Sequence, residues 1–468
     1  MAAAPTARAD AAAPTAHADV AAPTARAAAL AALPVGRAVL ELAWPGIVEQ
    51  SIRLVGQLTV FAFVAHLGAV ATAGVGASFN LLFLLFPVWN GFAIGTIALV
   101  SRRMGEGRPD AAGDALRQSL VLAAALGVAS GAAFAAGARP ALLALGAEPS
   151  VADAGAPFLA LVGGLNVFQT LSIISIAAIR AAGDTRTPMW LSVGSTVAMI
   201  PLAYLLIDAA GLGVLGAAIS IVAVNVLFAV ATLFVLLRGR AGLRLGGGPW
   251  VISRETSRTL SAIGLPAAAE SGLFSVGILA LGFLVFRLGT EAYAAHQILF
   301  QIEQVSFLPV MGLSAAASTL VGQALGMRDG SRATRVGWSA TRLALTWTVL
   351  IGAAFALFPA LFLGVFTGDA AVVAAGTGAT IALGLAQPAQ AVNFTLGASL
   401  RGAGDTRYTL AATVVNWFVV RLPLAALLSF PLGFGLAGVW LAIAIDYVVR
   451  SALLAVRFRG ARWQRHRY

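Results

Sequence analysis

Long apolar segments recur along the chain from Ala38 onward, separated by short polar or glycine-containing connections. Each segment is long enough to form a helix across the ~30 Å hydrocarbon core of a bilayer. The pattern therefore predicts an all-α membrane protein with twelve transmembrane helices. The first six are expected at 38–66, 71–100, 117–137, 156–179, 188–207 and 212–237, and the second six at 260–287, 291–323, 338–359, 373–400, 409–429 and 435–456.

The connections alternate in charge. Every second connection is rich in arginine, for example around Arg102, Arg180, Arg244, Arg332 and Arg407, and the intervening ones are short and poor in arginine. Positively charged loops stay on the cytoplasmic side of a membrane. Both chain ends are therefore expected in the cytoplasm, with the protein in the cell (inner) membrane.

Composition supports a membrane protein and excludes several other classes. Hydrophobic residues make up 59% of the chain and charged residues only 10%, whereas soluble domains carry roughly 25% charged residues. The net charge of +11 comes from arginines that cluster between apolar segments, so no nucleic acid partner is expected. There is no Cys, and the four His are not at metal-ligand spacing, so no metal or other cofactor is expected. No Walker A motif and no nucleophile–base pair stands out, which indicates that the chain is not an enzyme.

An internal duplication relates the two sets of six helices. The separation in sequence between Glu49 and Glu270 is the same as that between Gly105 and Gly326. The stretch RAAGDTR at 180–186 returns as RGAGDTR at 401–407 with this same repeat offset. Six spans per repeat give both halves the same orientation, so the pseudo-twofold axis runs along the membrane normal. Transporters place substrate and coupling ions at such a repeat interface, which predicts alternating access between two bundles.

The same features divide the chain into five regions. We expect a disordered, low-complexity cytoplasmic tail (1–37) built on a proline-containing nine-residue repeat, and an N-terminal six-helix bundle (38–237). A cytoplasmic linker (238–259), a C-terminal six-helix bundle (260–456) and a basic cytoplasmic tail (457–468) are expected to follow.

Several stretches resemble the multidrug and toxic compound extrusion (MATE) family of secondary transporters. They are LAWPGIVEQ, GTIALVSRRMGEG and AIRAAGDTRTPM in the first half, and IGLPAAAESGLFSVG, LGTEAYAAHQI, STLVGQALG and SLRGAGDTR in the second. The resemblance implies two six-helix bundles and cation-coupled export of small amphiphilic, often cationic, compounds. The acidic residue that many members carry in the first helix is replaced here by Val60, and Phe274 stands where another branch has an acid. The coupling site must therefore use other residues, with H⁺ or Na⁺ as the coupling ion.

Glu270 is the first candidate for coupling. It is expected near the middle of the seventh helix and has Phe274, not a cation, at i+4. A carboxylate buried without a cationic partner favours its protonated form and can exchange a proton. Glu49 occupies the equivalent position in the first half but has Arg53 at i+4, which predicts a structural ion pair. The alternative for Glu270 is a neutral acid that hydrogen-bonds across helices.

The eighth helix carries a polar stripe. Gln297, Gln301 and Gln304 are spaced i, i+4 and i+7. His296, Phe300 and Glu303 lie on an adjacent face, which makes Glu303 the second candidate for coupling or substrate binding. Such a stripe fits a cleft wall that offers a carboxylate and aromatic rings to an organic cation, although contacts between helices could also account for it.

Three further groups complete the candidate site. Arg421 lies deep in the eleventh helix and could pair with Glu303 or Glu270, whereas Asp446 has Arg450 at i+4 as a local partner. The further polar residues predicted to line the cleft or to pack between helices are Asn166, Gln169 and Gln390.

The preferred hypothesis is a cation-coupled antiporter that exports small amphiphilic molecules. A lipid-linked saccharide flippase is the alternative, but it should need an arginine-lined cleft, and only Arg53 and Arg421 lie deep in the spans. A non-transporting receptor is a third possibility. A small-molecule substrate, the bilayer and a monomeric state are the expected partners and assembly.

Overall fold

The computed structural model describes residues 24–239, 242–245, 250 and 253–465. The N-half comprises α2 (Val35–Ala65), α3 (Ala69–Phe83), α4 (Phe86–Gly105), α5 (Pro109–Ala144), α6 (Pro149–Gly164), α7 (Asn166–Ala181), α8 (Arg186–Tyr204), the π-helical segment η1 (Leu205–Ala209) and α9 (Gly213–Leu237), preceded by α1 (Ala25–Ala32). The C-half comprises α10 (Arg254–Phe286), α11 (Thr290–Gly326), α12 (Gly330–Leu357), α13 (Pro359–Gly364), α14 (Ala370–Gly402), α15 (Thr406–Val414), the π-helical segment η3 (Val415–Arg421), α16 (Leu422–Ser429) and α17 (Gly435–Arg459), followed by the 3-10 turn η4 (Arg462–Arg465).

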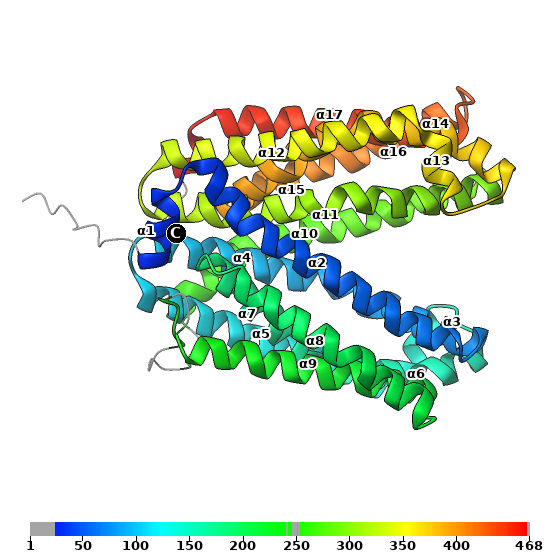
Figure 1. Cartoon of the computed structure of the whole chain (residues 1–468), viewed down its shortest axis with the longest axis horizontal. Helices are drawn as coiled ribbons and strands as arrows, with labels where there is room; N and C mark the ends of the chain where they lie inside the picture. The colour runs from blue at the N-terminus through cyan, green and yellow to red at the C-terminus, as the bar shows by residue number, and fades with distance from the viewer. Residues whose placement is uncertain (1–23, 240–241, 246–249, 251–252, 466–468) are drawn as a thin grey trace, which may run out of the picture.

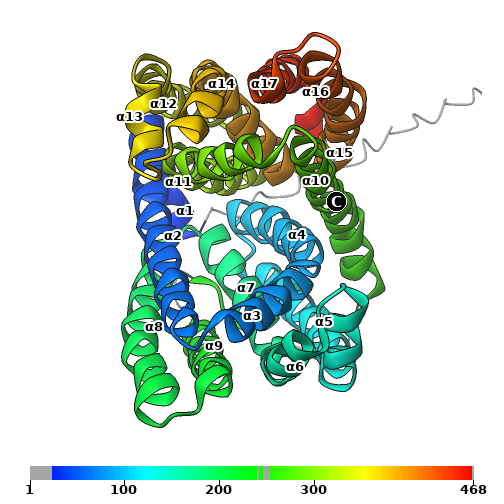
Figure 2. The ribbon, with the colours of Figure 1, turned by 90° about the vertical axis from the view of Figure 1, so that its right-hand side faces the viewer.

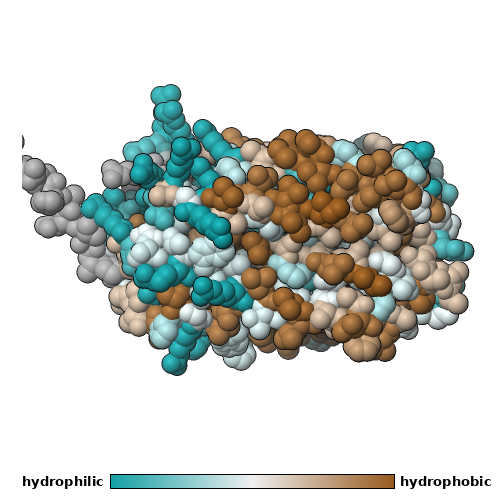
Figure 3. Space-filling model, turned by 90° about the horizontal axis from the view of Figure 1, so that it is seen from above, coloured by the Kyte–Doolittle hydropathy of each residue, from teal (hydrophilic) through white to brown (hydrophobic). Residues whose placement is uncertain are grey.

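These helices form the twelve predicted spans. Within the described residues ten spans are continuous by length and apolar composition, and two more are helix pairs bent by 42° (α3–α4) and 47° (α6–α7). The first bend lies just before Pro87 and the second follows Gly163 and Gly164, residue types that interrupt helices. Figure 3 shows apolar residues over the middle of the molecule and hydrophilic residues at its two ends, as a multi-pass membrane protein requires.

The first helix of each half packs against the other half. α2 contacts α8 of its own half and α11 of the C-half, and α10 contacts α15 of its own half and α4 of the N-half. In Figure 2 these two helices run along opposite sides of the molecule. Figure 1 shows the two halves meeting at the end where α1 lies and diverging at the opposite end.

Two glycines allow the halves to approach each other at the joined end. A Cβ on Gly105 would lie 2.1 Å from the carbonyl oxygen of Gln323, and a Cβ on Gly326 would lie 2.1 Å from that of Arg102. The two contacts are related by the repeat offset, so the pseudo-twofold axis relates them in space. The repeated glycines therefore serve close packing of α4 against α11.

The two GDTR stretches form turns that end one helix and begin the next. Gly183 and Gly404 have φ of 92° and 84°, a left-handed conformation in which glycine ends a helix without strain. Asp184 accepts the backbone N–H of Thr187 at 3.0 Å and so caps the start of α8.

The structure corrects the predicted terminal tails. Residues 1–23 of the expected disordered tail lie outside the described residues, but Ala25–Ala32 forms helix α1. Leu30 of α1 is buried, and the guanidinium of Arg26 donates to the carbonyl of Gly183 at 3.2 Å. The predicted basic tail begins at 457, but Arg457 still belongs to α17. The ring of Trp463 stacks on Phe458 of α17 with 4.5 Å between centroids, so the described part of this tail packs against the bundle. The alanine-rich segment 25–32 has high helix propensity, and burial of Leu30 together with the hydrogen bond of Arg26 holds α1 against the bundle.

The linker between the halves is shorter than predicted. α10 begins at Arg254 rather than at 260, with the Ser253 hydroxyl accepting the N–H of Thr256 as an N-cap. Within the linker Leu243 and Leu245 are buried, and the guanidinium of Arg117 donates to the carbonyl of Leu245 at 3.3 Å.

Candidate functional site

A buried ion pair joins the first and fourth spans of the N-half. The carboxylate of Glu49 on α2 lies 2.5 Å from the guanidinium of Arg180 at the end of α7. The predicted pair with Arg53 is wrong, because no ion pair within 4 Å joins these two residues. Glu49 is 1% exposed, and a carboxylate at that depth needs a direct cationic partner. The GDTR arginine therefore supplies the partner, although its position in a turn had suggested only a topological role.

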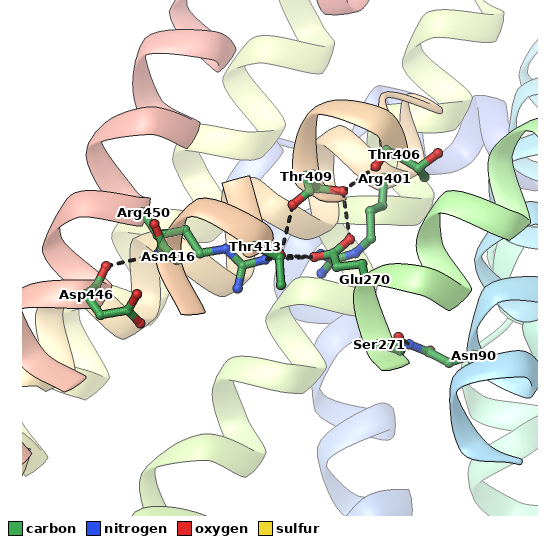
Figure 4. Close-up of polar contacts among 10 residues, drawn as sticks. All are labelled: Asn90, Glu270, Ser271, Arg401, Thr406, Thr409, Thr413, Asn416, Asp446 and Arg450. Atoms are coloured by element: carbon green, nitrogen blue, oxygen red, sulfur yellow. Dashed lines mark hydrogen bonds and ion pairs between the residues drawn. The ribbon is translucent and has the colours of Figure 1, made fainter. Parts of the chain in front are cut away.

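The C-half repeats this pair and enlarges it. The carboxylate of Glu270 on α10 lies 3.0 Å from Arg401 at the end of α14 and 2.7 Å from Arg450 on α17. It also accepts hydrogen bonds from the hydroxyls of Thr409 at 2.7 Å and Thr413 at 3.3 Å, both on α15. Figure 4 shows these side chains converging on Glu270 from three other elements.

This environment removes the physical reason for preferring Glu270 as the coupling residue. Its own helix offers no cation, as the sequence indicated, but two arginines from other helices bind it. Arg450 pairs with Glu270 and not with Asp446 as predicted. Glu270 also lies beside the last turn of α14 and the first turns of α15, near one end of those spans and not at their middle. Two guanidinium groups in contact with a carboxylate favour its ionised form, so the geometry gives no reason for Glu270 to exchange a proton.

Arg421 and Asp446 form a second buried ion pair in the C-half. The guanidinium of Arg421, at the end of η3, donates two hydrogen bonds to the Asp446 carboxylate on α17. It also lies over the ring of Trp417, 4.1 Å from its centroid. The predicted pairing of Arg421 with Glu303 or Glu270 is therefore wrong. The π-helical turn of η3 places Arg421 toward α17, which sequence spacing alone could not indicate.

Glu303 differs from the three acids described so far. It lies on α11, and its carboxylate accepts hydrogen bonds from the amide of Gln390 at 2.6 Å and from the hydroxyl of Tyr447 at 3.4 Å. No arginine among the described residues forms an ion pair with it within 4 Å. Arg421 acts on it electrostatically, but the guanidinium of Arg421 is bound to Asp446. Glu303 is therefore a carboxylate inside the membrane domain that is bound only by neutral donors.

The predicted polar stripe on α11 divides into an exposed and a buried part. Gln297, Gln301 and Gln304 are exposed. His296 is 2% exposed, accepts a hydrogen bond from the indole of Trp440 at 3.2 Å, and packs edge-on against Phe300. The prediction that His296 lines a cleft is therefore wrong in this structure, because the aromatic rings around it close off the imidazole.

The N-half contains a cavity of about 450 Å³. Asn166 and Gln169 line it, together with Arg53 from α2 and Trp89 from α4. This cavity lies within one half and is not the predicted cleft between the two bundles, so their predicted role stays a prediction. In the C-half, the side chains of Gln387, Gln390 and Asn393 on α14 are buried between helices and do not line this cavity. The polar residues of α7 therefore face a cavity, whereas those of α14 are packed between helices.

Sequence reasoning missed Arg180 and Arg401 as partners of the two glutamates. A signal was available, because the glutamate and the arginine of the first pair both recur in the second half at the repeat offset. A pair that is copied intact in both halves indicates a contact. Tyr447, Thr409 and Thr413 carried no comparable signal, because hydroxyl-bearing residues are common along all spans.

Comparisons with known proteins agree with this architecture. The family model MatE matches residues 45–205 and 266–427 of the chain. A protein described as a probable multidrug resistance protein, NorM, from Thermotoga maritima is 28% identical over 442 residues, which cover 92% of this chain and 94% of that protein. A protein of the same description from Bradyrhizobium diazoefficiens is 29% identical, with 90% and 92% covered.

Solved structures show the same fold. A transporter of the MOP superfamily from Pyrococcus furiosus superposes with a TM-score of 0.86, covering 93% of this chain and 98% of that one at 20% identity. A structure described as the outward-facing conformation of a multidrug resistance MATE family transporter has the same TM-score and coverage.

Proposed function

The chain belongs to the MatE family, and we propose on this basis that it is a cation-coupled efflux transporter that exports small amphiphilic molecules by alternating access. Relatives named as multidrug resistance proteins, similar along nearly their whole length, support the efflux role. The two halves are joined at the end that carries α1 and separated at the other, which corresponds in this proposal to an outward-open state. In this assignment the protein lies in the cell membrane with both termini in the cytoplasm.

The observation that carries the proposal is the state of Glu303. Glu49, Glu270 and Asp446 are each bound by at least one arginine. Among the residues that the structure describes, Glu303 is bound only by Gln390 and Tyr447. A carboxylate inside the membrane domain with neutral partners can gain or lose a proton without leaving an arginine unpaired. We therefore assign the coupling role to Glu303 in preference to Glu270.

Protonation of Glu303 would change contacts that connect three helices. Its hydrogen bonds join α11 to α14 through Gln390 and to α17 through Tyr447. A neutral carboxyl group accepts weaker hydrogen bonds than a carboxylate, so proton binding would loosen both contacts. Because α11 also packs against α2 and α4 of the N-half, this change could reach the interface at which the two halves rock.

A second candidate ion is Na⁺, favoured by one specific observation. The side-chain oxygens of Gln387 and Gln390 are buried and accept no hydrogen bond among the described residues. Together with the Glu303 carboxylate they could offer oxygen ligands to a hard cation. The experiment below separates the two ions.

The test uses the full chain reconstituted into liposomes that are loaded with fluorescein or rhodamine 123. A proton gradient and a sodium gradient, each directed inward, are imposed separately, and the dye retained is measured. We expect one gradient to accelerate efflux and Glu303→Gln to abolish that acceleration. Glu291→Gln replaces an exposed acid on the same helix and should leave coupling unchanged. Equal acceleration in wild type and Glu303→Gln would exclude Glu303 as the coupling residue, and no acceleration by either gradient would exclude the antiporter.

The other hypotheses gain no support. A flippase for pyrophosphate-linked lipids should present several free arginines, but Arg421 is bound to Asp446. The relatives above are named as multidrug resistance proteins and not as flippases or receptors.

A further inference from the structure

The N-half cavity is lined by helices of one half only. Its lining residues come from α2, α3, α4, α6, α7, α8 and α9. Its volume of about 450 Å³ is within the range of small-molecule sites, roughly 300–1,000 Å³. The charge and hydrogen-bonding groups on its wall therefore indicate which class of molecule it can hold.

Arg53 gives the cavity a positive charge. It lies near the middle of α2, its side chain is exposed within the cavity, and it forms no ion pair within 4 Å among the described residues. The nearby acid, Glu49, is already bound by Arg180 at 2.5 Å. Arg53, Arg180 and Glu49 together carry a net charge of one positive unit. None of the described residues lining the cavity is acidic. An arginine inside a membrane domain is costly unless it faces water or a ligand.

Further donors on the wall have no partner. The indole Nε1 of Trp89 is buried and donates to nothing among the described residues. The amides of Gln57, Asn80 and Gln169 also line the cavity, and none forms a hydrogen bond with another described residue. A buried donor without an acceptor is unfavourable, so a ligand that offers an acceptor would satisfy the indole of Trp89. The amides of Gln57 and Asn80 are exposed within the cavity and free to bind the same ligand.

Aromatic side chains supply the apolar part of the wall. Phe83 and Phe86 stack with 5.2 Å between ring centroids, and Phe79 and Phe228 line the cavity as well. Such faces bind flat apolar rings. The wall thus combines ring surfaces, one guanidinium and several amide and indole donors.

The duplication places an apolar residue at the position equivalent to Arg53. The equivalent position in the second half is Phe274, which packs edge-on against Trp417 at 5.4 Å between centroids. The same helix position is therefore filled by an apolar ring in the C-half. The repeated helix geometry can therefore form without a cation at this position, which favours a role in ligand binding for the charge of Arg53.

From these observations we propose that the N-half cavity binds an amphiphilic aromatic anion, such as a carboxylate or sulfonate on a fused-ring scaffold, with its acidic group on Arg53. A guanidinium can bind both oxygens of such a group at once. This inference rests on the proposed function, because it names the substrate class of the transporter. It also differs from the cationic substrates that the family resemblance implies.

The test measures binding alone, so it does not depend on coupling. Fluorescein and rhodamine 123 share a xanthene scaffold and differ in charge, and their binding to the purified full chain is followed by fluorescence anisotropy in neutral detergent. We expect wild type to bind fluorescein at least tenfold more tightly than rhodamine 123. Arg53→Gln should weaken fluorescein binding at least tenfold and leave rhodamine 123 binding unchanged, and Trp89→Phe should weaken fluorescein binding less.

Controls keep the result interpretable. Arg139→Gln removes an arginine that is exposed at a distance from the cavity and should not change binding. Arg53→Lys keeps the charge and should retain part of the affinity, which would separate recognition from misfolding. Glu291→Gln, at an exposed acid outside the cavity, should bind fluorescein like wild type. Because binding is measured without an ion gradient, failure of coupling and failure of this inference are distinguishable.

Three results would overturn the inference. They are tighter binding of rhodamine 123 by wild type, fluorescein binding that Arg53→Gln does not weaken in a folded protein, and displacement of fluorescein by equimolar phosphatidylglycerol. The last result would identify a lipid headgroup as the occupant in place of a soluble substrate.

Discussion

The guanidinium of Arg180 lies 2.5 Å from the carboxylate of Glu49. At the equivalent positions of the C-half, the guanidinium of Arg401 lies 3.0 Å from the carboxylate of Glu270. In both pairs the two residues are 131 positions apart. Each pair ties the first span of a half to the end of its fourth span, just before a GDTR turn. The duplication has thus preserved a buried tie at equivalent places in the two halves.

Breaking one of these ties should destabilise the protein strongly. Glu49→Ala leaves Arg180 without its carboxylate, and removing one member of a buried ion pair costs about 3–5 kcal/mol. Replacing both members, as in Glu49→Leu with Arg180→Met, should recover part of the loss. Denaturation of the purified protein in mixed micelles measures the change. Arg139→Gln breaks an exposed ion pair with Asp153 and should change the stability little. If Glu49→Ala changed the stability no more than Arg139→Gln, the role of the buried pair would be refuted.

Alanine at either glycine of the α4–α11 contact should push the halves apart. A Cβ at Gly105 or Gly326 would lie 2.1 Å from a backbone oxygen, and overpacking of this kind costs roughly 1–3 kcal/mol. Gly105→Ala and Gly326→Ala should act alike, because the pseudo-twofold axis relates them. Distances between spin labels at the joined end of the two halves would report the separation.

Gly137 supplies the control for this experiment. It lies inside α5, and a Cβ there would meet no atom within 4 Å. Gly137→Ala should leave the label distances unchanged and add about 0.5–1 kcal/mol of helix stability. Unchanged distances in all three variants would contradict a tight interface at α4–α11.

The hydrogen bonds to Glu303 should set the pH dependence of coupled transport. Tyr447→Phe removes a donor that stabilises the ionised carboxylate, so the pH profile of gradient-driven efflux should move to higher pH. Gln390→Leu removes the shorter bond, 2.6 Å against 3.4 Å, and should move the profile further in the same direction. Tyr408→Phe removes a hydroxyl that donates to the carbonyl of Leu453 instead, and should not move it. A shift toward lower pH would contradict the assignment of Glu303.

Asp329 is the N-cap residue of α12 and lies outside the membrane-spanning segments. Its ionisation should make the free energy of unfolding depend on pH. Burial acts to raise the pKa of Asp329, but hydrogen bonds from the Ser331 hydroxyl and the Arg332 N–H, together with the charge of Arg335, outweigh it and lower the pKa. A depressed pKa in the folded state means that the cap contributes stability above the unfolded pKa and loses it as pH falls through the folded value.

The variant Asp329→Ala tests this cap on α12. It should cost about 1 kcal/mol at neutral pH, and the difference from wild type should shrink in acid. Asp329→Asn keeps an oxygen acceptor and should lose less. Thermal unfolding between neutral and acidic pH checks both variants, and a deficit that stays constant with pH would argue against the cap.

The amino-acid sequence by itself determined the twelve spans, the duplication and its constant offset, because apolar length and repeated motifs are properties of the chain alone. It also singled out Glu303, Asn166 and Gln169. It could not assign partners to the charges: the neighbour of Glu49 at i+4 is Arg53, but its ion pair is with Arg180, 131 residues away. Only tertiary structure decided that arginines bind three acids while Glu303 and Arg53 have no ion-pair partner among the described residues. The physical reason is that a buried charge is stabilised by whichever opposite charge the packing of helices brings within reach, and that packing is not encoded in sequence spacing.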